Sequence, residues 1–178
     1  VEDDYEWLTE QLVKVANTCC NGRVISVLEG GYKIHGGIIS PFARSVASIL
    51  EPEGVWALEV AYLPLMLKFN AFDAICHEHL EYYSLKSIKY IVAQAGLKVV
   101  DVSMNTVNGG SFAVTVAHED NTSIEINKPV INWLLSQEDA MGLYTPRPYR
   151  EFEERVYRHR KDLIGLVRLL ASAGKKIL

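Results

Sequence analysis

A chain of 178 residues, of which 49% are hydrophobic and 22% charged, carries enough apolar sequence for a globular domain with a substantial core, so a disordered chain is excluded. The net charge of -4 and the scattered basic residues exclude a nucleic-acid-binding surface. No apolar run is long enough to span a bilayer, no signal peptide is evident, and three cysteines favour a reducing compartment, so we expect a cytoplasmic protein.

The first fifty residues predict a helix, a strand and a second helix. Asp3 or Asp4 can cap the first helix, which we expect to end at the Asn-Gly pair 21–22. Its apolar stripe consists of Tyr5, Leu8, Leu12, Val15 and Ala16. Arg23–Leu28 is short and rich in β-branched residues, which is typical of a buried strand. Pro41–Leu50 is predicted as the second helix, with proline in its first turn.

The next forty residues predict a strand, a polar loop and a helix. Val55–Leu63 is an apolar run with the character of a buried strand, and Leu85–Ala95 has helical periodicity with Ser84 as its N-cap. Between them, Phe72–Tyr83 holds the densest group of reactive side chains, namely Cys76, His77, Glu78, His79 and Glu81. Because open α/β sheets bind ligands beyond the carboxyl ends of their strands, this loop is the first candidate site.

The remainder predicts a hairpin followed by two helices. Leu97–Met104 and Ser111–His118 read as strands, and the Asn-Gly-Gly within the connection Asn105–Gly110 favours a hairpin. Asn127–Met141 is expected to form a short helix. Two prolines then interrupt the chain, and Tyr149–Ala173 is expected to form a long helix.

Five motifs follow one another between about Gly54 and the end of the chain. They are Gly54-Val55-Trp56-Ala57-Leu58-Glu59-Val60, Cys76-His77-Glu78-His79-Leu80, Tyr82-Tyr83-Ser84, Asn108-Gly109-Gly110-Ser111 and Gly174-Lys175-Lys176. In order and spacing they resemble the second half of the S-adenosylmethionine-dependent sugar C-methyltransferases, which methylate a carbon beside a keto group on nucleotide-linked deoxysugars.

This resemblance implies that His79 is the general base that removes the proton next to the ketone, and that Glu78 helps to position substrate or base. The sugar pocket would be lined by His77, Tyr82, Asn108, Gly109, Gly110 and Ser111. For His79 alone, an ordinary hydrogen-bonded loop histidine is the alternative. The substrate implied is a nucleotide-linked sugar, and the cofactor implied is S-adenosylmethionine.

The cofactor cradle of that family has no counterpart in residues 1–53, which contain neither its glycine-rich loop nor its acidic residue for the ribose. We therefore expect this chain to bind no cofactor and to be catalytically silent in isolation. An active methyltransferase acting on a keto-sugar is the alternative. We also expect no metal, because His77 and His79 lack the spacing of a zinc-binding helix motif and need further ligands from elsewhere.

A second resemblance covers roughly Glu2 to Ile49. Its motifs are Asp4-Tyr5-Glu6-Trp7 and Arg23-Val24-Ile25-Ser26-Val27-Leu28-Glu29-Gly30-Gly31-Tyr32, which are similar to the C-terminal end of the histone deacetylase family. It implies that Tyr32 descends from a catalytic tyrosine that stabilises an oxyanion. No Asp-x-His zinc motif occurs in the chain, so an ordinary turn residue is the favoured interpretation of Tyr32, and a deacetylase remnant is a second alternative. The two pieces would join near residues 50–53, as in a chimera.

Together these patterns predict an α/β domain over residues 1–120 and a helical appendage over 121–178. The domain would be half of a Rossmann-like methyltransferase sheet of about four strands, the last two antiparallel. The methyltransferase resemblance implies the strand order Arg23–Leu28, Val55–Leu63, Ser111–His118, Leu97–Met104, and we expect a right-handed crossover to join the first two strands. The first strand would then be an apolar edge, and we expect a homodimer that buries this edge or the apolar stripe of the last helix.

Overall fold

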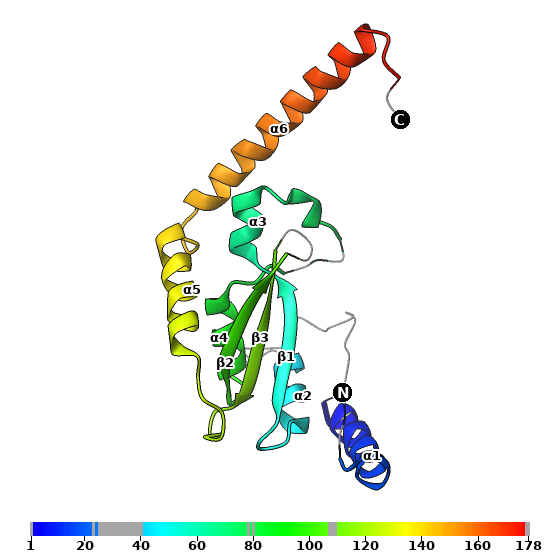
Figure 1. Cartoon of the computed structure of the whole chain (residues 1–178), viewed down its shortest axis with the longest axis vertical. Helices are drawn as coiled ribbons and strands as arrows, with labels where there is room; N and C mark the ends of the chain where they lie inside the picture. Colours follow the sequence, from blue (N-terminus) through cyan, green and yellow to red (C-terminus); the bar gives the residue numbers. More distant parts are fainter. Residues whose placement is uncertain are drawn as a thin grey trace. The chain divides into compact units, whose positions relative to one another are not determined.

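The computed structural model describes residues 2–22, 24, 41–77, 79, 81–106 and 110–176. Their elements, in chain order, are α1 (Glu2–Cys20), α2 (Pro41–Ile49), β1 (Val55–Ala61), α3 (Leu63–Phe69), the 3-10 turn η1 (Phe72–Ala74), α4 (Leu85–Ala93), β2 (Leu97–Asn105), β3 (Ser111–His118), α5 (Lys128–Met141) and α6 (Arg147–Ser172) (Figure 1). None of the helices within these residues is long and apolar enough to cross a membrane.

The three strands form one antiparallel sheet in the order β1-β3-β2, with β3 in the middle (Figure 1). Every residue of β3 is buried or half-buried, as expected for a central strand, whereas alternate residues of β1 are exposed from Val55 to Glu59. The predicted order of the last three strands is therefore confirmed. The predicted strand Arg23–Leu28 lies outside the described residues except for Val24, which is exposed and not part of a strand, so its place beside β1 stays a prediction.

The chain divides into two compact units. The first comprises Val1–Glu59, Lys86–Ser103 and Ala113–Ile131, and the second comprises Val60–Leu85, Met104–Phe112 and Asn132–Leu178. The predicted boundary at residue 120 is not tested by this division, and it stays a prediction.

The core of the first unit is built mainly from small and β-branched side chains of the strands and of α2, α4 and α5. It contains Ala43, Val46, Ile88, Val92, Leu97, Val99, Val100, Val102, Val114, Val116, Ala117 and Ile131. The end of α2 is tied to β3 because Nε2 of His118 donates to the carbonyl oxygen of Leu50 over 2.8 Å. Helix α4 begins at Leu85 as predicted and ends at Ala93, two residues before its predicted end, and the chain turns after it at Gly96 with a positive φ of 73°.

Helix α1 ends as predicted at the Asn-Gly pair 21–22, where both residues have positive φ. Its predicted apolar stripe is only partly buried. α1 lies against α2, and Ala16 is buried, but Leu8, Leu12 and Val15 remain about half exposed. The stripe predicted from periodicity is thus largely solvent-facing, because the contact with α2 covers only part of the helix.

The second unit contains a helix that the sequence does not predict. The expected strand Val55–Leu63 stops at Ala61, and the chain turns at once into α3, which carries Pro64 in its first turn and ends at the left-handed Asn70. α3 forms the core of this unit with α6. The buried side chains are Met66, Leu67, Leu143 and Phe152, and Leu63, Ala71, Ala74, Tyr82, Met141 and Val156 pack against them.

Helix α6 begins at Arg147, so the prolines at 146 and 148 open this helix instead of separating it from the preceding segment. Phe152 anchors its first turns in the core, and a guanidinium nitrogen of Arg155 donates to the carbonyl oxygen of Leu67 at 2.5 Å, near the end of α3. This contact satisfies one of the carbonyl groups left unpaired at a helix end.

Candidate functional site

The imidazole of His79 contacts the backbone of its own loop. Its Nδ1 lies 2.9 Å from the carbonyl oxygen of Ala74, the last residue of η1. A carbonyl oxygen can only accept a hydrogen bond, so Nδ1 must carry the proton of this contact. In the neutral ring the lone pair then resides on Nε2, which is the nitrogen free to act as a base.

The same carbonyl oxygen accepts a second hydrogen bond, from the hydroxyl of Tyr82 over 3.3 Å. Tyr82 is half-buried and packs against the core formed by α3 and α6. The backbone N–H of His79 also donates to the carbonyl of Cys76 at 3.2 Å, which closes a turn. The carbonyl oxygen of Ala74 therefore links the predicted base, His79, to Tyr82 and through it to the core.

The other predicted residues of this loop are placed only in part. Cys76 and His77 are exposed, whereas Glu78 lies outside the described residues. Within the part of the chain that the structure describes, no three His, Cys, Asp or Glu side chains are grouped to hold a metal ion. The assignments of Glu78 and His77 stay predictions.

Of the second predicted loop, Gly110 and Ser111 are described, and Asn108 and Gly109 lie outside the described residues, as does Tyr32. The carbonyl oxygen of Gly110 accepts the N–H of Tyr62 at 3.1 Å, and a Cβ on Gly110 would come within 2.6 Å of Leu65. Gly110 is thus packed against α3, and the buried Ser111 begins β3.

The sequence interpretation missed Glu138, a glutamate in the last turn of α5 that is 0% exposed. Ile131 and Leu134 precede it on the same helical stripe and are also buried. A carboxylate at a core position of an amphipathic stripe is the signal that could have found it, because burying a charge is costly without strong partners.

Those partners are the two ends of the segment that carries the candidate site. The hydroxyl of Tyr62, just after β1, donates to Oε1 of Glu138 at 2.8 Å, and the N–H of Leu85, the first residue of α4, donates to the same oxygen at 2.5 Å. The negative charge also faces the positive end of the α4 dipole. Burial, and then the charge and hydrogen bond of Glu138, raise the pKa of Tyr62 well above its ordinary value.

A second tyrosine is restrained next to this junction. The hydroxyl of Tyr83 donates to the carboxylate of Glu81, and burial together with this contact raises the pKa of Tyr83 above its ordinary value. The backbone of Tyr83 pairs in parallel with that of Tyr62. Both tyrosines therefore stay protonated at neutral pH and act as hydrogen-bond donors.

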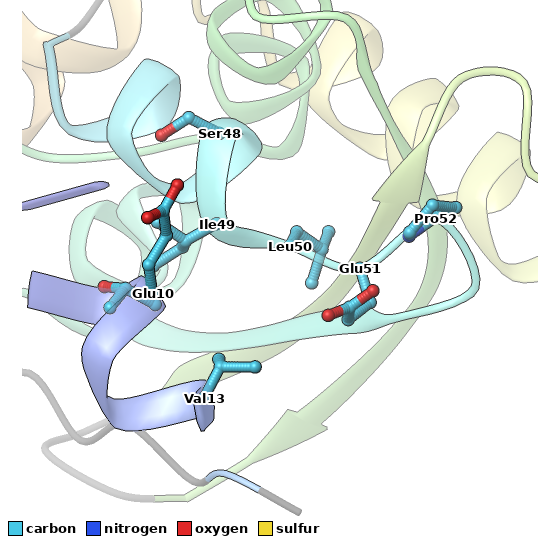
Figure 2. Close-up of a pocket in the computed structure, with 8 residues that line it drawn as sticks. Glu10, Val13, Ser48, Ile49, Leu50, Glu51 and Pro52 are labelled. Atoms are coloured by element: carbon cyan, nitrogen blue, oxygen red, sulfur yellow. The ribbon is translucent and has the colours of Figure 1, made fainter. Parts of the chain in front are cut away.

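A separate cavity of about 290 Å³ lies in the first unit, where α1 meets the end of α2. Figure 2 shows Glu10 and Val13 on one side and the segment from Ser48 to Pro52 on the other. Of the predicted site residues that the structure describes, none lines it.

Two comparisons bear on these features. Residues 106–178 match the sequence profile of the family described as the C-methyltransferase C-terminal domain. The chain is also 39% identical over 134 residues to the C-methyltransferase NovU of Streptomyces niveus, a match that covers 75% of this chain and 31% of NovU. The chain is therefore related to the C-methyltransferases, and it spans about a third of the length of this curated relative.

The extent of the match moves one predicted boundary. A stretch of 134 residues in a chain of 178 begins no later than residue 45, which lies within α2 and before the predicted join at residues 50–53. At least the second half of α2 thus belongs to the methyltransferase-like part. The deacetylase resemblance of the residues before it stays a prediction.

Proposed function

We propose that the part of the chain from α2 onward is the substrate-side half of an S-adenosylmethionine-dependent C-methyltransferase, with His79 as the base that deprotonates the carbon beside the keto group of a nucleotide-linked sugar. The orientation of His79 is the observation that carries this proposal, because a ring held through Nδ1 by the carbonyl of Ala74 presents Nε2 as the proton acceptor. The relationship to the C-methyltransferases supports the reaction class.

The loop supplies what a carbon base needs. When Nε2 takes up the proton, the ring becomes positively charged, and the carbonyl dipole of Ala74 at Nδ1 stabilises that charge without moving. The hydroxyl of Tyr82 on the same oxygen keeps the carbonyl in place. The electrons left on the substrate form an enolate, whose carbon is the nucleophile of a methyl transfer.

The order and directions of β1, β3 and β2 support a position at the end of a Rossmann-like sheet, where an antiparallel strand is inserted between two parallel ones. In this proposal the predicted strand Arg23–Leu28 pairs with the edge of β1 that faces away from β3. The loop after β1 then lies at the carboxyl end of a parallel pair, where such folds bind ligands.

S-adenosylmethionine, when bound, would supply the electrophilic methyl group. The described residues do not fit this cofactor, because neither strand-to-helix connection among them, Tyr62 or residues 119–127, contains the glycine that a close approach to the nucleoside requires. We propose that these 178 residues by themselves do not transfer a methyl group. The alternative is a chain that is active as it stands, since NovU carries the name of a C-methyltransferase.

Calorimetric titration with S-adenosylmethionine distinguishes the two cases. We expect a dissociation constant no tighter than about 1 mM, and no methyl transfer to a nucleotide-linked keto-deoxysugar. Micromolar binding, together with a methylated product that disappears in His79→Ala, would instead show a complete enzyme.

A further inference from the structure

The carboxylate of Glu138 connects the two loops in which the candidate site is predicted. One of its oxygens, Oε1, accepts both the hydroxyl of Tyr62 at 2.8 Å and the N–H of Leu85 at 2.5 Å. Its side chain has no contact with solvent. The arrangement places a carboxyl group in the interior, where hydrogen bonds such as these two offset the cost of burying it.

The first loop is closed at its base by this oxygen. Tyr62 stands immediately before the segment that contains α3, η1 and His79, and Leu85 immediately after it. The N–H of Leu63 donates to the carbonyl of Tyr83 at 2.9 Å, which reinforces the same closure. A segment whose two ends share one acceptor atom has little freedom to shift them relative to each other.

The second loop is fixed through the same tyrosine. The backbone N–H of Tyr62 donates to the carbonyl of Gly110 at 3.1 Å, and its ring packs against Phe112 with the centroids 4.7 Å apart. The end of the β2–β3 connection is therefore attached to the residue that Glu138 holds. A change at Glu138 acts on both loops together.

We propose that Glu138 is a positioning residue for His79. It fixes Tyr62 and Leu85, and through the base of the loop it fixes Tyr82, whose hydroxyl shares the carbonyl of Ala74 with Nδ1 of His79. The consequence for the reaction rests on the proposed function, because it matters only if His79 is the base. The positioning itself is independent of any substrate.

An aliphatic side chain would continue the apolar stripe of α5 without the cost of a buried charge. Such a side chain has no acceptor atom, so it could not accept hydrogen bonds from the N–H of Leu85 and the hydroxyl of Tyr62. We infer that the carboxylate is present for this geometry, and that a glutamine, whose amide oxygen can accept the same two bonds, preserves it.

The test is the protonation state of the His79 ring, read by long-range nitrogen–proton NMR on the whole chain without substrate. The wild-type ring should carry its proton on Nδ1. Glu138→Ala should lose this single tautomer, and the amide of Leu85 should exchange about tenfold faster or more. Glu138→Gln should restore both signals, and Gln137→Ala, an exposed neighbour on α5, should change neither.

If Glu138→Ala does not fold, Tyr62→Phe serves in its place, because it removes one of the two donors and keeps the ring that packs on Phe112. A wild-type His79 ring protonated on Nε2 would overturn the proposal. So would a folded Glu138→Ala or Tyr62→Phe variant in which the His79 ring stays protonated on Nδ1. The proposed function is tested separately. A chain that shows these tautomer changes but does not act on a keto-sugar supports the positioning role of Glu138 and contradicts only the assignment of His79 as the base.

Discussion

Gly110 illustrates at the scale of one residue how the second loop depends on α3. Its φ of 130° is a conformation that side-chain-bearing residues rarely adopt, and a Cβ would lie 2.6 Å from Cδ1 and 2.9 Å from Cβ of Leu65. We expect Gly110→Ala to lower the free energy of unfolding by about 2–4 kcal/mol, from backbone strain and overpacking together. Urea denaturation measures this change.

Gly96→Ala is the matched control, because Gly96 also has a positive φ, of 73°, but has nothing within 4 Å of the added Cβ. Only the backbone cost of about 1–2 kcal/mol should remain. Equal losses in the two variants would mean that Gly110 is not packed against Leu65.

Tyr62 gives a pH dependence whose sign follows from its raised pKa. The ordinary tyrosine pKa of 10.0 applies to the unfolded chain, whereas in the folded chain Tyr62 keeps its proton at higher pH. The stabilisation of the folded chain that comes from this difference in the Tyr62 pKa is complete below pH 10. It is lost as the pH rises above 10, by up to about 1.4 kcal/mol per pH unit.

Tyr62→Phe should remove this part of the slope and, at neutral pH, lower the free energy of unfolding by about 1–3 kcal/mol, since Glu138 loses a buried donor. Urea unfolding between pH 8 and 11.5 measures both effects. Tyr90→Phe is the control, because Tyr90 is 61% exposed. A wild-type slope that Tyr62→Phe leaves unchanged would show that Tyr62 ionises normally.

The sequence reveals residues of this site only where their chemistry is conspicuous. His79 stands out because imidazoles and carboxylates cluster around it in the sequence. Glu138 does not, because its role arises from a distance of 2.8 Å to Tyr62, a residue 76 positions away in the chain. Nor can the sequence show that Ala74 holds the ring, because that contact uses a backbone carbonyl.

At the scale of the element, α6 carries an apolar stripe that is only partly buried. Its first turns pack on α3 through Phe152, but farther along the stripe Leu163, Leu166 and Val167 are 50%, 51% and 40% exposed. We propose that this part of the stripe is buried in a homodimer, because apolar side chains repeated at helical spacing are stabilised when removed from water.

Leu163→Lys should then raise the dimer dissociation constant at least about tenfold, since the symmetric contact loses two leucines. Light scattering over a dilution series measures it. Leu169→Lys is the matched control, because Leu169 is 65% exposed and lies off the stripe. A wild-type chain that is monomeric at every concentration would reject the dimer, and equal weakening by both variants would reject this face.

Elements with a single clear period are well predicted, and those with mixed signals are not. α4, β2, β3 and α5 match their expected ranges within a residue or two, because Gly96 and the hairpin glycines punctuate them. α3 is missed because its apolar run continues that of β1, and no polar residue marks the change from strand to helix at Tyr62.

At the scale of the whole molecule, the proposed function rests on the relationship to the C-methyltransferases and on the local geometry of His79. The relationship to the C-methyltransferases covers three quarters of the chain, and the geometry gives His79 a defined proton acceptor. The relationship alone does not assign a role to any residue. The match covers 31% of NovU, and a part of that size need not contain the complete site. The order of the last three strands could be predicted because the methyltransferase resemblance implies that the last strand lies between the two strands before it.

The most direct measurement is hydrogen–deuterium exchange of a nucleotide-linked keto-deoxysugar in D₂O, followed by NMR at the carbon beside the ketone. Removal of this proton needs only the substrate and the base, so the reaction can be observed without a methyl donor. Although we expect no methyl transfer by this chain, we predict that it accelerates this proton exchange above the buffer rate and that His79→Ala abolishes the acceleration. His118→Gln, in which the changed ring contacts Leu50 in the first unit, should retain it. Exchange at the buffer rate with the folded wild-type chain, or acceleration that survives in His79→Ala, would contradict the assignment of His79 as the base.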